Sequence, residues 1–135
     1  MDSPGLKIIN WGITFTTKIW SDMRPKDLDG KTRKIKVGCG TLYLTVNFNN
    51  KKPVELFLNG SKLGGCRANQ EGLSRLVSLA FKTGTDVGDV IDQLELIKCP
   101  ACTRAKAKLS NEEEVKEFPT SCSDAIAKFL SSVTS

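Results

Sequence analysis

This chain of 135 residues contains five cysteines and no histidine, and this composition limits the catalytic and metal-binding chemistry that it can perform. The absence of histidine removes the usual general base at neutral pH, the histidine-activated nucleophiles and any zinc site with a histidine ligand. Cysteine thiolates would therefore have to hold a transition metal, and four of them from separate elements would satisfy tetrahedral zinc. The other interpretation is that several of the five are small, buried apolar residues.

The cysteines stand where the backbone affects their chemistry. Cys66 and Cys122 are predicted to open helices, where unpaired amides and the helix dipole lower the pKa of a thiol. Cys39 lies between two glycines, which let the backbone approach a metal or ligand closely. Cys99 and Cys102 form a C-x-x-C motif, which indicates either a pair of metal ligands or a redox dithiol.

A second candidate site is the glycine-rich segment 59–65, just before the predicted long helix. Free amides at a helix start can bind the phosphate of a nucleotide or a related anion. The candidate ligand residues are Ser61, Lys62, Gly64, Gly65, Arg67, Asn69 and Arg75. The segment has no Walker or dinucleotide-binding fingerprint, so a plain strand-to-helix connection is the other interpretation.

Two periodicities predict the elements that must position these residues. Apolar residues alternate over 8–20, 34–37, 41–48 and 54–58, which predicts the strands of an antiparallel sheet with a hairpin loop at 49–53. Leu42, Leu44, Val46 and Phe48 are predicted to share its buried face.

Helical spacing takes over in the second half of the chain. Helices are predicted over 66–82, over 86–94 with Asp86 as N-cap, and from about 121 onward. The inward stripe of the long helix is predicted as Cys66, Leu73, Leu76, Val77, Ala80 and Phe81. The charged stretch that follows Cys102, up to about Pro119, lacks apolar periodicity, and its run of acidic residues, Glu112 to Glu114, is predicted to lie in a loop. Strands followed by helices predict an α+β fold, an antiparallel sheet covered by two or three helices in a single compact domain.

The formal net charge is +5 at pH 7, a moderate excess that argues against nucleic acid as a partner. The basic segments 24–36 and 98–108 could instead steer an anionic ligand, or be solvated loops and strand edges. The N-terminus lacks the features of a signal peptide, and no apolar run approaches the ~20 residues of a membrane span. Together with the odd number of cysteines, these features predict reduced thiols, a cytoplasmic location and no membrane association.

Four cysteine-centred motifs, in this order, resemble the TSCPD domain family. They are GCGTLYLTVN at 38–47, LGGC at 63–66, IKCP at 97–100 and TSCSDAIA at 120–127. The family occurs at the C-terminus of adenosylcobalamin-dependent ribonucleotide reductases and as free-standing small proteins. The resemblance spans about 29–130, so we divide the chain into an N-terminal strand and loop, 1–28, and a TSCPD-like domain, 29–135.

This resemblance implies a cysteine-rich, zinc-binding accessory or interaction module without catalytic residues of its own. The family cysteines correspond to Cys39, Cys66, Cys99 and Cys122. Cys102 is additional to the family set, so it is a substitute ligand, a redox partner of Cys99 or incidental. Ser123 replaces the proline of the family's name, which removes a favoured residue of a first helical turn. The implied partners are a ribonucleotide reductase or another protein, and a homo-oligomer is compatible with the sequence.

Three functions remain open at this point. The chain could be a zinc-binding module, a nucleotide or phosphate-binding protein using segment 59–65, or a dithiol redox partner acting through Cys99 and Cys102. Hydrolytic or transferase catalysis finds no support in the residues. We therefore expect a protein that is not an enzyme.

Overall fold

The computed structural model describes residues 23–60 and 64–134. Its elements are β1 (Asp29–Val37), β2 (Gly40–Asn49), β3 (Lys52–Asn59), α2 (Gly64–Lys82), α3 (Val87–Leu94), α4 (Pro100–Ala107), α5 (Glu112–Glu117) and α6 (Cys122–Thr134). This order of strands and then helices confirms the predicted α+β class. The predicted strand over 8–20 lies outside the described residues.

The three strands form one antiparallel sheet in the order β1-β2-β3. Asn50 and Lys51 both have positive φ, 53° and 67°, which is the backbone of a tight two-residue hairpin turn and confirms the loop between β2 and β3. β1 begins at Asp29 rather than at Lys34. The sequence pattern missed its first part because those polar residues pair with β2 while their side chains stay exposed.

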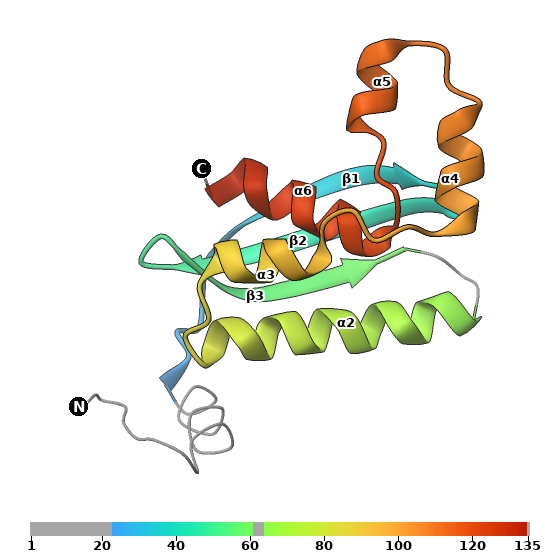
Figure 1. The fold of residues 1–135 in the computed structure, drawn as a ribbon. Coiled ribbons are helices and arrows are strands. Elements are labelled where there is room, and N and C mark those ends of the chain that lie inside the picture. Colours follow the sequence, from blue (N-terminus) through green and yellow to red (C-terminus); the bar gives the residue numbers. More distant parts are fainter. Residues whose placement is uncertain (1–22, 61–63, 135) are drawn as a thin grey trace.

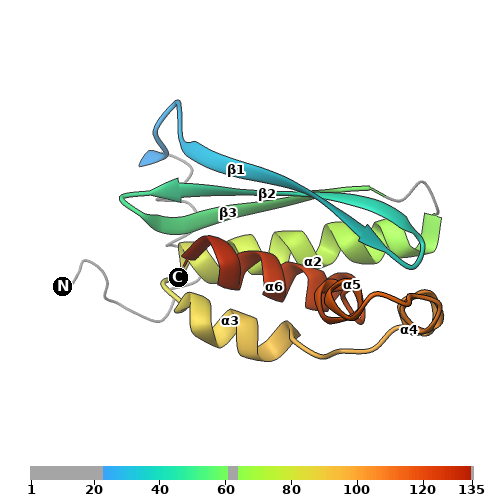
Figure 2. The same cartoon turned by 90° about the horizontal axis from the view of Figure 1, so that it is seen from above.

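Helices α2 and α6 pack on one face of the sheet, and α3 packs against these two helices on their side away from the strands (Figures 1 and 2). Leu42, Leu44 and Val46 of β2 are fully buried there. Phe129 and Leu130 of α6 are buried with them in the same core. These residues confirm the predicted buried face of β2, of which Phe48 is only partly buried. No helix in the described part of the chain is both long and apolar enough to cross a bilayer.

The segment between α3 and α6 contains two helices, α4 and α5. Because Glu112 to Glu114 form the first turn of α5, the prediction of a loop there was wrong. α4 begins with Pro100 at its start, where the missing amide proton costs nothing. Asn111 caps α5 by accepting hydrogen bonds from the amides of Glu113 (2.8 Å) and Glu114 (3.3 Å). None of the α5 residues is buried. A proline at the start of α4 and a capping asparagine at the start of α5, rather than an apolar stripe, therefore mark where these two helices begin. Both helices project beyond the edge of β1 (Figure 1).

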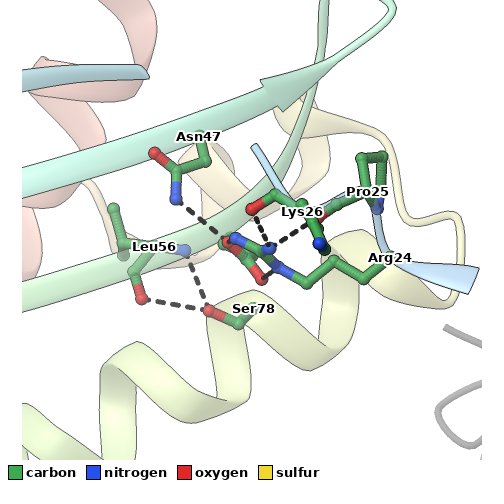
Figure 3. Close-up of polar contacts among 7 residues, drawn as sticks. Arg24, Pro25, Lys26, Asn47, Leu56 and Ser78 are labelled. Atoms are coloured by element: carbon green, nitrogen blue, oxygen red, sulfur yellow. Dashed lines mark hydrogen bonds and ion pairs between the residues drawn. The ribbon is translucent and has the colours of Figure 1, made fainter. Parts of the chain in front are cut away.

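The inward side of α2 also differs from the predicted stripe. Leu76 is 65% exposed and Cys66 is exposed, whereas Ser78 is buried. The Ser78 hydroxyl accepts a hydrogen bond from the Leu56 amide at 2.9 Å and donates one to the Leu56 carbonyl at 3.0 Å. Because β3 is an edge strand, its outward backbone groups need partners, and α2 supplies them with the hydroxyl of Ser78, which is not part of the predicted stripe (Figure 3).

The chain before β1 is tied to β3 by a buried carboxylate. Arg24 donates two hydrogen bonds to Glu55, from Nε at 2.7 Å and from Nη2 at 3.0 Å. Asn47 donates a third, from Nδ2, at 3.0 Å; Figure 3 shows this cluster. The hydrogen bonds from Arg24 lower the pKa of Glu55 below its usual value, although burial opposes them.

Glu55→Gln is expected to reduce the dependence of stability on acidic pH. Because the pKa of Glu55 is lowered by folding, the ionised carboxylate stabilises the fold at neutral pH, and this contribution is lost as the pH falls through the folded-state value. Urea unfolding between about pH 6 and pH 2 measures how the free energy of unfolding changes with pH, and this slope gives the number of protons taken up on unfolding. In the variant that number should be smaller by up to about one. Glu71→Gln is the matched control, because the Glu71–Arg75 pair is exposed and contributes little. Equal slopes for wild type and Glu55→Gln would contradict the assignment.

Candidate metal centre

All five cysteines lie at one end of the sheet. Cys39 is in the turn between β1 and β2, Cys66 in the first turn of α2, Cys99 just before α4, Cys102 in the first turn of α4 and Cys122 at the start of α6. The β1–β2 turn and the starts of these three helices meet at the same end of the molecule in both views (Figures 1 and 2). The fold therefore gathers the four predicted ligands, and Cys102 with them, from distant parts of the chain.

The thiols influence one another's ionisation. Burial raises the pKa of Cys39, and the neighbouring Cys66 and Cys99 raise it further. Burial is also the main cause of the raised pKa of Cys102 and of Cys122, to which other cysteines of the group add. Each thiolate formed at this end of the molecule thus makes the next one harder to form.

Cys99 is the exception, because its pKa is lowered. The amide of Cys102, followed by that of Ala101, stabilises its thiolate and outweighs burial. Cys99 is the N-cap of α4, although its side chain does not accept a regular capping hydrogen bond. The expectation that the pKa of Cys122 is lowered at a helix start was wrong, since burial outweighs the hydrogen bond from Gln70 Nε2 at 3.4 Å.

Cys102 belongs to the core as well as to the cysteine group. Its side chain is 1% exposed, and its Sγ accepts a hydrogen bond from the Gly38 amide at 3.2 Å. Gly38 itself lies so close to α4 that a Cβ there would run into the backbone of Ala101 and Cys102. The β1–β2 turn, with Cys39 at its tip, is therefore held directly against the start of α4.

The donor set fits a soft metal ion, because thiolates suit zinc and the chain offers no histidine. Within residues 23–60 and 64–134, however, no three Cys, Asp or Glu side chains are close enough together to coordinate one ion as they stand. The thiols still affect one another's pKa values because charges interact over longer distances than the ~2.3 Å of a zinc–sulfur bond. Side-chain movement toward an ion would be needed to complete a site.

Asp124 is a positioning residue that sequence reasoning passed over. The carboxylate is 1% exposed and accepts hydrogen bonds from the amides of Leu96 and Thr120, both at 2.9 Å. In return, the Asp124 amide donates to Ser121 Oγ at 3.0 Å, a variant of the capping box at the start of α6. Burial alone would raise the pKa of Asp124, but the two amides outweigh it and lower the pKa.

These contacts place Cys99 beside Cys122. Thr120 accepts a hydrogen bond from the Cys99 amide at 2.8 Å and donates from Oγ1 to the Ile97 carbonyl at 2.7 Å. The segment leading into α4 is thus fastened to the residues leading into α6. The S-x-x-D spacing of Ser121 and Asp124 was the signal that could have revealed this role.

The second predicted site is only partly assembled. A cavity of about 550 Å³ lies between β3 and α2, and Arg67 and Arg75 line it. Asn69 is exposed on α2 and does not line the cavity, while Gly64 and Gly65 form the first residues of that helix. The two remaining candidates, at 61 and 62, fall outside the described residues.

Comparison with known families gives one match: the TSCPD domain model matches residues 13–133. The matched range contains all five cysteines and begins inside the segment 1–28. Searches of curated proteins and of solved structures found no match.

Proposed function

Because this chain belongs to the TSCPD domain family, a family related to ribonucleotide reductases, we propose that it is a zinc-binding accessory module with no catalysis of its own. The observation that carries this proposal is the gathering of all five thiols at one end of the fold, where they affect one another's ionisation. The proposed ligands are Cys39, Cys66, Cys99 and Cys122.

Electrostatics supports a cation in this position. Burial and neighbouring thiols make Cys39 and Cys122 resist deprotonation, and a divalent ion would reverse that preference by stabilising thiolates. Cys99 already has a lowered pKa, so it is the thiol most ready to bind first. A zinc ion would connect the β1–β2 turn to the starts of α2, α4 and α6 and would contribute directly to folding stability.

A static module of this kind acts through its surface. We expect it to work in the cytoplasm beside a ribonucleotide reductase or another protein, either as a single chain or as a homo-oligomer. The zinc would fix the shape of the domain, and the partner would contact the face that this shape presents.

Single cysteine variants test the proposed ligand set. Cys39→Ser and Cys122→Ser are each expected to lower the affinity for zinc by about tenfold or more, and so the zinc retained through purification, because three thiolates hold structural zinc far less well than four. Cys102→Ala is the matched control, and it should keep its zinc if Cys102 is outside the ligand set. Elemental analysis of the purified variants gives the answer. Full zinc content in both serine variants would contradict the assignment.

A redox role for Cys99 and Cys102 is the second candidate. It is favoured by the lowered pKa of Cys99 at the start of α4 and by the interaction of its thiol with that of Cys102, since a reactive thiolate beside a buried thiol is a common redox arrangement. Mild oxidation with diamide, followed by peptide mass spectrometry, distinguishes the two functions. A reversible Cys99–Cys102 disulfide in metal-free, folded protein would favour redox chemistry, and its absence would exclude it.

Binding of a nucleotide or phosphate between β3 and α2 is a third candidate. It is supported by the two arginines, Arg67 and Arg75, that line the 550 Å³ cavity, although Arg75 also pairs with Glu71 at 2.6 Å. Calorimetry against a panel of nucleotides tests it. Heat that disappears in Arg67→Ala would support this site, and no heat from any nucleotide would exclude it.

A further inference from the structure

The face of the sheet opposite α2 and α6 carries two exposed aromatic side chains. Tyr43 on β2 is 45% exposed and Phe57 on β3 is 51% exposed. In the register of these strands Phe57 lies opposite Thr45, which makes it the diagonal neighbour of Tyr43. Diagonal neighbours on one face lie about 7–8 Å apart, within reach of one another for aromatic side chains. The two rings therefore form one platform.

Hydrogen bonds confirm which side chains share this face. The hydroxyls of Thr32 and Thr45 lie 2.7 Å apart, so alternate residues of β1 and β2 point the same way. By the same alternation, Lys34 lies opposite Tyr43 and Lys36 opposite Thr41 on the open side. The platform is thus flanked by hydroxyls and by two lysines of β1.

The charge of this face is positive. Among the described residues, Lys34 and Lys36 form no ion pair, since the pairs present join Arg24 to Glu55, Arg75 to Glu71 and Lys128 to Asp124. Glu55 points to the open side with Asn47, but Arg24 neutralises it. The net charge of the whole chain, +5, does not reveal that these two lysines lie beside the exposed aromatic rings on this face.

We propose that the open face of the sheet binds single-stranded nucleic acid, with bases stacked on Tyr43 and Phe57 and phosphates contacting Lys34 and Lys36. Aromatic rings on a sheet accept the flat face of any base, while lysines beside them follow the phosphate backbone. The expectation from sequence, that nucleic acid is not a partner, rested on total charge. It did not take into account that strand register brings these four residues to the one face of the sheet that the described helices leave uncovered.

Fluorescence anisotropy with labelled oligothymidine of about 15 nucleotides tests the proposal. Wild type should bind in low salt, and Tyr43→Ala with Phe57→Ala should weaken the affinity by about 30-fold or more, because each stacked base contributes roughly 5- to 150-fold. Lys34→Ala should reduce the slope of log affinity against log salt by about 0.7. Leu76→Ala and Lys108→Ala remove an exposed apolar residue and an exposed lysine elsewhere, and both should bind like wild type.

Two results would overturn the proposal: no binding by folded wild type, or equal binding by the doubly substituted protein. Circular dichroism checks that each variant is folded, which we expect because both aromatic residues are exposed. Sedimentation identifies the competing occupant, since a wild-type dimer that becomes monomeric in the double variant, without oligonucleotide binding, would make this face an interface between copies. The zinc content of the double variant should equal that of wild type, so this test is independent of the metal site.

Discussion

Asp124→Ala is expected to lower the free energy of unfolding by about 2–4 kcal/mol. The Asp124 carboxylate is buried and accepts two backbone hydrogen bonds, from Leu96 and Thr120. Alanine leaves both amides without their partner, and an unsatisfied donor in a protected position costs about 1–3 kcal/mol. Leu96 has a positive φ of 63°, an unfavourable conformation for leucine that this hydrogen bond helps to hold.

Chemical denaturation of wild type and variants measures this effect. Asp89→Ala is the matched control, because Asp89 also lies in the first turn of a helix but is exposed; its loss should cost less than about 1 kcal/mol. Alkylation of Cys99 and Cys122 should become faster in Asp124→Ala, since the two segments are no longer fastened together. A loss of stability no greater than that of Asp89→Ala would show that Asp124 does not hold the site.

Gly38→Ala is expected to cost about 3 kcal/mol and to disturb the cysteine end of the molecule. A Cβ at this position meets the backbone of Ala101 and Cys102, which cannot yield as a flexible side chain can. The β1–β2 turn and α4 must therefore move apart. That movement breaks the hydrogen bond from the Gly38 amide to Cys102 Sγ and exposes a buried thiol.

The same chemical change at Gly72 provides the control. Gly72 lies inside α2, and a Cβ there meets nothing within 4 Å. Alanine at this position should stabilise the protein by about 0.5–1 kcal/mol, because glycine is a poor helix former. Opposite signs for Gly38→Ala and Gly72→Ala, together with faster alkylation of Cys102 in the first alone, are the expected result. Unchanged stability in Gly38→Ala would mean that the turn does not press on α4.

The apolar pattern of the sequence predicted those elements that bury one face and expose the other. The alternation of Leu42, Leu44 and Val46 predicted β2 because one face of that strand is buried and the other is not. α5 could not be predicted in this way, since none of its residues is buried and its start depends on the Asn111 cap. Leu76 was misplaced because the buried side of α2 includes polar groups, such as Ser78, that pair with the backbone of β3.

For the candidate site, sequence reasoning identified the cysteines but not their environments. The motifs around Cys39 and Cys122 indicated family ligands, whereas the burial that raises the pKa of Cys122 comes from packing between distant segments. The same is true of Cys102, whose contact with Gly38 spans 64 residues of sequence. Spacing alone does not encode such contacts.

Zinc content measured together with thiol accessibility, on one preparation of the full chain, is the most direct test of the proposed metal centre. We predict about one zinc ion per chain, slow alkylation of Cys39, Cys66, Cys99 and Cys122, and fast alkylation with lower thermal stability after a chelator is added. A folded protein without metal, whose cysteines react at the same rates before and after chelation, would contradict the proposal.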